Sequence, residues 1–109
     1  MNPSTLEAEL ANDSRLLVAA FYAFTPLDDE RRETLLSSLP TLARNGSVLG
    51  SVLVAHEGVN GTISGPESAV DAVLDHLRAS LDLGDDHYAR LEVKRSWAEK
   101  PVFRRFKAR

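Results

Sequence analysis

Apolar segments alternate with segments of helical periodicity along the chain. Residues 16–24 are almost wholly apolar and include Phe21, Tyr22 and Phe24, so they predict a strand that is buried on both faces or nearly so. Shorter runs of apolar or alternating residues predict three further strands, at about residues 50–56, 61–64 and 88–95. Two segments of helical spacing lie between these strands, which gives the order β-α-β-β-α-β.

The first helix is expected to begin at Thr25-Pro26-Leu27-Asp28. The threonine can act as the N-cap, and proline fits the first helical position. We expect the helix to kink or restart near Leu39, because Pro40 has no backbone N–H to donate. It should end at Asn45-Gly46, since either residue can adopt the left-handed conformation of a helix stop. Its apolar face is formed by Leu35, Leu36, Leu39, Leu42 and Ala43.

The second helix is expected to begin at Ser64-Gly65-Pro66-Glu67, where a glutamate follows a serine by three residues. Its core stripe consists of Val70, Val73, Leu74, Leu77 and Leu81. The order of elements predicts the α+β class and a ferredoxin-like, or acylphosphatase-like, sandwich with two helices on one face of a four-stranded antiparallel sheet. Right-handed crossovers place the first and third strands side by side in the centre of this sheet.

Composition is typical of one domain that does not enter a membrane. The chain has 109 residues, of which 43% are hydrophobic, and no apolar run approaches the roughly 20 residues of a membrane span. It has no cysteine, which excludes disulfides, thiolate metal sites and cysteine nucleophiles within it. The beginning of the chain does not resemble a signal peptide, so a cytoplasmic location is expected. We divide the chain into a peripheral segment 1–15, a ferredoxin-like domain 16–96 and a basic exit segment 97–109.

The segment from Ala55 to Gly65 is the most distinctive part of the sequence. Its hairpin motif comprises His56, Glu57, Gly58, Asn60 and Gly61. Gly58, Asn60 and Gly61 all tolerate positive φ angles, so we expect the chain to reverse sharply here. His56 and Glu57 should lie at the mouth of the hairpin. Because adjacent strand residues point to opposite faces, they are not expected to act as an acid–base pair; Glu57 is expected to accept backbone N–H bonds across the turn.

Neither a metal site nor a cofactor site is expected. His56 and His76 belong to different elements, His87 lies in a polar break, and no His-x-x-x-His pair exists. The glycines of the hairpin form neither a Walker loop nor a dinucleotide fingerprint. Acylphosphatases have an arginine-bearing phosphate loop after the first strand, whereas residues 25–28 in that place include an acidic side chain that would repel phosphate.

Charge is unevenly distributed along the chain. Residues 90–109 carry eight basic and two acidic side chains, whereas residues 1–89 carry five basic and fourteen acidic ones. The basic residues that can contact RNA phosphates are Lys94, Arg95, Arg104, Arg105 and Lys107. Trp97, Phe103 or Phe106 can stack on bases. A solvated edge strand or an interdomain contact explains the same composition equally well, and the aromatic pattern of an RNA-recognition motif is absent.

Several segments together form a pattern found in one protein family. They are Phe21-Tyr22-x-Phe24, the strand from Gly50 to Leu53, the segment Ala55 to Gly65, Lys94-x-Ser96 and Pro101-Val102-Phe103-x-Arg105-x-Lys107. The pattern spans residues 16–109 and resembles the N-terminal domain of the rhodanese-related tRNA uridine(34) hydroxylases. The resemblance implies that the complete protein converts the wobble uridine of tRNA to 5-hydroxyuridine with oxygen. It also implies that the reactive cysteine lies in a following rhodanese-like domain, to which residues 97–109 lead.

The resemblance implies an accessory role for this chain. No catalytic residue is expected in it, so it should be inactive alone, support the rhodanese-like domain and contact tRNA. Residues 96–109 mix apolar and basic side chains without a polar stop, so we expect the chain to be part of a longer oxidoreductase that acts on tRNA. The alternative is a stand-alone ferredoxin-like module that binds a small ligand or a protein.

Overall fold

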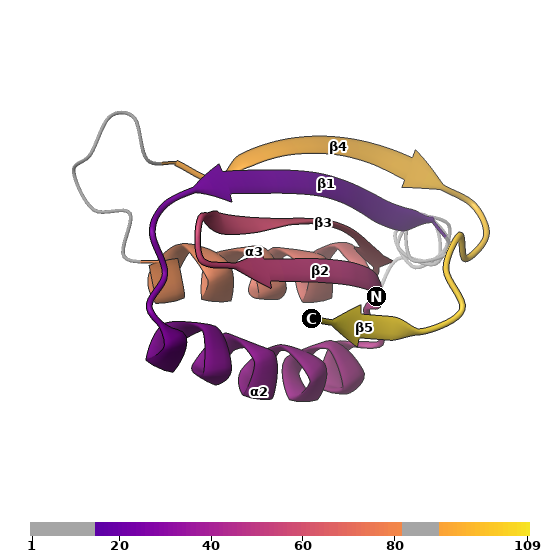
Figure 1. The fold of residues 1–109 in the computed structure, drawn as a ribbon. Coiled ribbons are helices and arrows are strands. Elements are labelled where there is room, and N and C mark those ends of the chain that lie inside the picture. Colours follow the sequence, from indigo (N-terminus) through magenta and orange to yellow (C-terminus); the bar gives the residue numbers. More distant parts are fainter. Residues whose placement is uncertain (1–14, 82–89) are drawn as a thin grey trace.

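The computed structural model describes residues 15–81 and 90–109, which form an α+β sandwich (Figure 1). The strands are β1 (Leu16–Phe24), β2 (Leu49–Ala55), β3 (Gly58–Gly65), β4 (Glu92–Ala98) and β5 (Phe106–Ala108). The helices are α2 (Asp29–Gly46) and α3 (Glu67–Leu81), and both pack on the same face of the sheet. The predicted class and the order from β1 to β4 are therefore confirmed. Most of the predicted peripheral segment lies outside the described residues.

Among the described residues the sheet has five strands in the order β4-β1-β3-β2-β5, so the prediction of four strands is wrong. The adjacent places of β1 and β3 in the middle of the sheet are as predicted. β5 is parallel to β2, whereas the other pairs are antiparallel. Phe106 and Ala108 pack against the core, and the backbone N–H of Arg109 donates to Val52 at 3.0 Å. The sheet thus extends into the segment that the sequence assigned to the exit from the domain.

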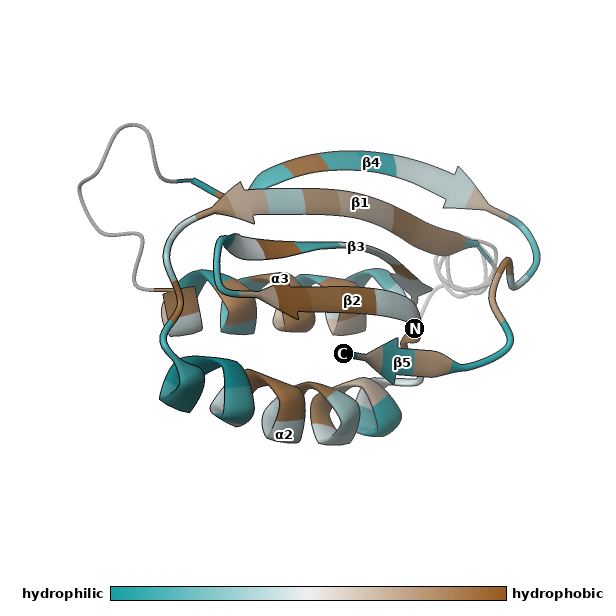
Figure 2. Ribbon diagram, viewed as in Figure 1, coloured by the Kyte–Doolittle hydropathy of each residue, from teal (hydrophilic) through white to brown (hydrophobic). Residues whose placement is uncertain are grey.

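β1 is buried on one face only, contrary to the prediction of burial on both. Leu17, Ala19, Phe21 and Ala23 are buried against the helices. Tyr22 and Phe24 alternate with them and are 48% and 74% exposed. Figure 2 shows that β1 is hydrophobic over much of its length. Both helices cover the same side of the sheet, so the other face of β1 is exposed. The hydrophobic composition of β1 alone did not show this.

Helix α2 ends at Gly46, within the predicted stop, but it differs from its prediction at its start, at Pro40 and in the residue that adopts the left-handed conformation. Asp28 is the N-cap, and its carboxylate accepts a 2.8 Å bond from the N–H of Arg31. The helix continues through Pro40, because buried residues on both sides of the proline hold it against the core. Ser47, with φ of 58°, takes the left-handed position that ends the helix, so neither of the two predicted stop residues does so.

Helix α3 has the predicted core stripe, since all five residues of that stripe are buried. Ser64 does not start the helix but lies within β3. The first helical hydrogen bond instead runs from the N–H of Val70 to the carbonyl of Pro66, at 3.0 Å. The sheet and the two amphipathic helices therefore enclose one core and leave the opposite face of the sheet without a helix from the described part of the chain.

Candidate functional site

His56 and Glu57 form the two-residue turn between β2 and β3, with Ala55 paired to Gly58. The carbonyl of His56 accepts a bond of 2.8 Å from the N–H of Leu27, and that of Glu57 accepts one of 3.0 Å from the N–H of Thr25. The turn therefore holds the connection between β1 and α2. Among the three residues expected to reverse the chain, only Gly58 has a positive φ, of 144°. Asn60 and Gly61 lie within β3 instead.

Gly61 has a packing role within the sheet. A Cβ atom at this position would overlap the carbonyl oxygen of Ser51 and lie 2.9 Å from the Cα of Val52. Glycine therefore allows β2 and β3 to approach each other closely opposite Phe21. The glycine spacing of the hairpin motif follows from backbone packing rather than from a ligand.

The side chain of His56 binds the beginning of α2. Its Nε2 lies 2.7 Å from Oδ1 of Asp29 and 3.1 Å from Nη1 of Arg32. The hydrogen bond with His56 is the main cause of a lowered pKa of Asp29, and the charges of His56 and Arg32 lower it further. Because Asp29 also lies in the first turn of α2, its negative charge is favourable there. This cluster fastens the hairpin turn to the helix.

Replacement of His56 by alanine is expected to raise the pKa of Asp29 toward its ordinary value of 3.8. In the native protein the pair stabilises the fold above that ordinary value, and the contribution is lost as the pH falls through the lowered pKa of the folded state. A carboxyl-carbon NMR titration measures the change. The control is His76→Ala, because the ring of His76 binds Ser38 on α2 at 2.8 Å instead. An unchanged Asp29 pKa in His56→Ala contradicts the assignment.

Backbone N–H groups of the β1–α2 connection and of the first turn of α2 are bonded within the fold. The N–H groups of Thr25 and Leu27 donate to the hairpin carbonyls. The N–H of Arg31 in the first turn of α2 donates to the carboxylate of Asp28. An anion at this helix end would have to displace these bonds and approach acidic side chains. These contacts give the loop a connecting role between β1, the hairpin turn and α2.

The five predicted RNA-contacting cations do not share one surface. Lys94 pairs with Ala20 of β1 and Lys107 pairs with Ser51 of β2, which places both lysines on the open face of the sheet. Arg95 points to the other face, where its Nη1 lies 2.9 Å from Oδ1 of Asp71 on α3. This bond is the main cause of the raised pKa of Arg95. Arg95 thus holds β4 to α3.

The remaining predicted cations and aromatic residues lie near the end of the chain. Arg104 and Arg105 are exposed in the connection before β5. Phe106 packs against the core and is not free to stack on a base. Trp97 is partly exposed and lies under the guanidinium carbon of Arg15, which is 5.2 Å from its ring centroid. Of the predicted aromatic candidates, Phe106 is therefore a packing residue.

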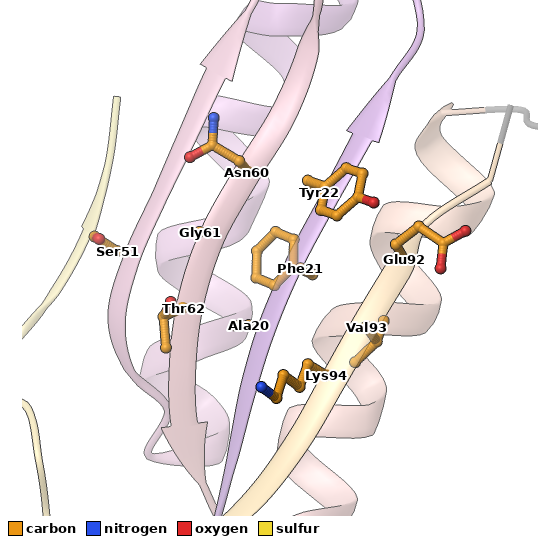
Figure 3. Close-up of a pocket in the computed structure, with 10 residues that line it drawn as sticks. All are labelled: Ala20, Phe21, Tyr22, Ser51, Asn60, Gly61, Thr62, Glu92, Val93 and Lys94. Atoms are coloured by element: carbon orange, nitrogen blue, oxygen red, sulfur yellow. The ribbon is translucent and has the colours of Figure 1, made fainter.

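A depression of about 620 Å³ on the open sheet face was not predicted from the sequence. Its lining includes Ala20, Tyr22, Ser51, Asn60, Thr62 and Lys94, which come from four strands (Figure 3). We call it the sheet-face trough. Residues of β1 alternate between buried and exposed positions, and this alternation identifies the side of the trough that carries the aromatic ring of Tyr22. That signal becomes specific only when the covered face of the sheet is known.

The described residues contain no group of three side chains that together can hold a metal ion. His76, which was considered as a ligand in the sequence, instead joins α3 to α2 through Ser38. His87 lies outside the part of the chain that the structure describes. Within residues 15–81 and 90–109, neither helix is long and apolar enough to cross a membrane.

Residues 16–109 match the family described as the UPF0176 acylphosphatase-like domain. The chain belongs to this family. It is 94% identical over all 109 residues to a tRNA uridine(34) hydroxylase of Synechococcus sp. (strain CC9605), of which it covers 33%. It is 42% identical to the protein of the same name from Rhizobium leguminosarum bv. trifolii (strain WSM2304), over 92% of the chain and 30% of that protein. The chain thus spans about one third of these relatives' length.

Solved structures show a related fold. An acylphosphatase from Coxiella burnetii matches with a TM-score of 0.56 and 15% sequence identity, over 87% of this chain and 94% of that protein. A bacterial light-regulated adenylyl cyclase matches with a TM-score of 0.60 and 12% identity, over 86% of this chain and 27% of that protein. These likenesses show the acylphosphatase-like α+β fold. They carry no assignment of activity, because the sequence identities are only 15% and 12%.

Proposed function

We propose that the chain is the N-terminal accessory domain of a tRNA uridine(34) hydroxylase. The observation that carries this proposal is the 94% identity of the whole chain to one third of a protein with that name. The proposed reaction of the complete protein is oxygen-dependent formation of 5-hydroxyuridine at the wobble position of tRNA, in the cytoplasm. The domain itself supplies no cysteine, so the reactive thiol must come from another part of the protein.

The proposed role of the domain is to support a following rhodanese-like domain and to contact tRNA. Residues 97–109 first complete β4, then provide β5, and finally lead toward the catalytic part. Lys94, Lys107 and the arginine pair Arg104 and Arg105 are exposed cations that favour contact with an anionic partner. Arg95 is assigned to the fold rather than to tRNA, because its guanidinium is engaged by carboxylates of α3.

A chimeric enzyme tests the proposal. The 109 residues replace the matching third of the Synechococcus relative, and nucleosides from treated tRNA are analysed by mass spectrometry. We expect 5-hydroxyuridine from the chimera, none from the 109 residues alone, and a large loss when the relative lacks its first third. The control is the chimera with the reactive cysteine of its rhodanese-like domain changed to serine.

Three results contradict the proposal in different ways. Formation of 5-hydroxyuridine by the 109 residues alone shows that the domain is itself catalytic. Full activity of the relative without its first third shows that the domain does not support the reaction. A chimera that folds but makes no product, while the relative does, shows that the two proteins are not equivalent in this part.

A further inference from the structure

The sheet-face trough follows from side-chain size along one row of the sheet. Ser51, Thr62 and Ala20 are neighbours on β2, β3 and β1. They are small, and Lys94 and Lys107 end the row on the two outer strands. The next row contains the larger side chains of Leu53, Asn60 and Tyr22, again on three adjacent strands. Small residues beside larger ones produce the depression, and its polar groups remain open to a ligand.

Tyr22 of β1 lines the trough, and the ring of Phe24 lies beside it on the same strand. Tyr22 and Phe24 are two residues apart and therefore project from the same face. Their ring centroids are 5.5 Å apart with an interplanar angle of 52°. Tyr22 is about half exposed and Phe24 is largely exposed, although burial of such rings is strongly favourable. Exposed aromatic rings on adjacent positions of a sheet are suited to stacking with successive unpaired bases.

Polar and charged groups of the trough complement a nucleotide. Asn60 is directly opposite Tyr22 on β3, and its amide offers both donors and an acceptor to a base edge. Lys94 extends from β4 over β1 (Figure 3). The two lysines are four strand spacings apart, which is roughly 19 Å. One phosphate cannot reach both, so an anionic chain that uses them must cross the sheet.

We propose that the sheet-face trough binds unpaired nucleotides of RNA, with bases stacked on Tyr22 and Phe24 and the backbone held by Lys94 and Lys107. The inference rests on the proposed function, in which this domain contacts tRNA, and names the surface that does so. A covering protein domain would also bury the two rings. The lysines at both edges and the polar row between them favour a polyanion over a second protein surface.

Glu92 is the one acidic residue in the lining of the trough. It pairs with Tyr22 across β1 and β4, and its carboxylate lies 4.0 Å from Nε of Arg90. Its position next to the aromatic ring places it near a base rather than at the lysine row. A carboxylate there can accept a hydrogen bond from a base amino group. Glu92 therefore does not oppose binding of the RNA phosphate backbone along the row of small residues.

Binding of fluorescein-labelled oligouridylate and of unmodified tRNA to the 109-residue chain tests the inference. Tyr22→Leu retains an apolar side chain but removes the stacking ring, and we expect at least roughly fivefold weaker oligouridylate binding. Lys94→Gln should lower the slope of log affinity against log salt by about 0.7. The matched control is Lys100→Gln, which removes an exposed lysine in the β4–β5 connection and should leave that slope unchanged.

A second variant, Ala20→Glu, places a carboxylate on the floor of the trough. Ala20 is exposed, so the glutamate needs no burial and should leave the unfolding midpoint unchanged. We expect this variant to lose oligouridylate binding more completely than Tyr22→Leu. An unfolding midpoint equal to that of the wild type, together with lost oligouridylate binding, supports the inference. A general folding defect would lower both the midpoint and the binding.

Several outcomes separate this inference from the proposed function. If the wild-type chain binds tRNA but Tyr22→Leu and Ala20→Glu bind it equally well, the trough is not the contact and the inference is overturned. If the wild type binds neither RNA, both the trough and the tRNA contact fail. If the variants keep RNA binding but make the domains of the chimera separable by proteolysis, the trough is instead covered by the following domain, which also overturns the inference.

Discussion

Replacement of Gly58 by alanine is expected to lower the free energy of unfolding by about 3 kcal/mol or more. Gly58 has a φ of 144°, which residues with a side chain rarely adopt. An added Cβ would also overlap the carbonyl oxygen of Ala23 on β1. The neighbouring strand is central in the sheet, so it cannot move away without breaking other pairs. Urea unfolding followed by circular dichroism measures the loss.

Asn60→Ala is the matched control for Gly58→Ala. Asn60 lies two residues further along β3 and is exposed, so its loss should change stability by less than about 0.5 kcal/mol. An unfolding midpoint of Gly58→Ala near that of the wild type would show that β3 adjusts its backbone at this position. The assignment of Gly58 to a backbone requirement of the hairpin motif would then be wrong.

The parts of the fold that the sequence predicts are those determined by local spacing. The five apolar residues of α3 recur with helical period, so their common burial follows from the sequence alone. The start of α2 does not follow in this way. Thr25 has the chemistry of a cap, but its N–H donates to the carbonyl of Glu57. The chain therefore stays non-helical until Asp28, and this contact joins residues more than thirty positions apart in the sequence.

β5 could not be predicted for a related reason. Its three residues are too few to show the alternation of a strand. Phe106 and Ala108 pack against the core only because β2 leaves a free strand edge with which they can pair. The continuation of α2 through Pro40 likewise depends on packing, since local preference favours a break there. Tertiary contacts thus decide the elements in which local signals are short or in conflict.

The residues of the candidate site also could not be assigned from local sequence signals alone. Lys94 and Arg95 are adjacent and chemically alike, yet one lies on the open face and the other binds α3. Sequence alternation shows that they point in opposite directions, but not which direction is open. The same ambiguity applies to Phe21 and Tyr22, of which the first is buried and the second exposed. Once the positions of the helices are known, each strand residue can be assigned to the covered or the open face of the sheet. The residues that line the trough can then be identified.

Leu74→Ala is expected to lower the free energy of unfolding by about 2–5 kcal/mol. Leu74 is fully buried on α3, and this helix packs against both β1 and β3. The substitution removes apolar contacts and leaves a cavity that the two central strands cannot close by moving together. Calorimetry or urea unfolding measures the loss.

Asp75→Ala on the same helix is the control for Leu74→Ala. It removes only an exposed ion pair with Arg78 and should change stability by less than about 0.5 kcal/mol. Below its own unfolding transition, Leu74→Ala should retain RNA binding, because the residue lies on the helix side of the sheet and the trough on the other. A loss of RNA binding by folded Leu74→Ala protein would mean that core packing sets the shape of the trough, and the two faces could not then be treated as independent.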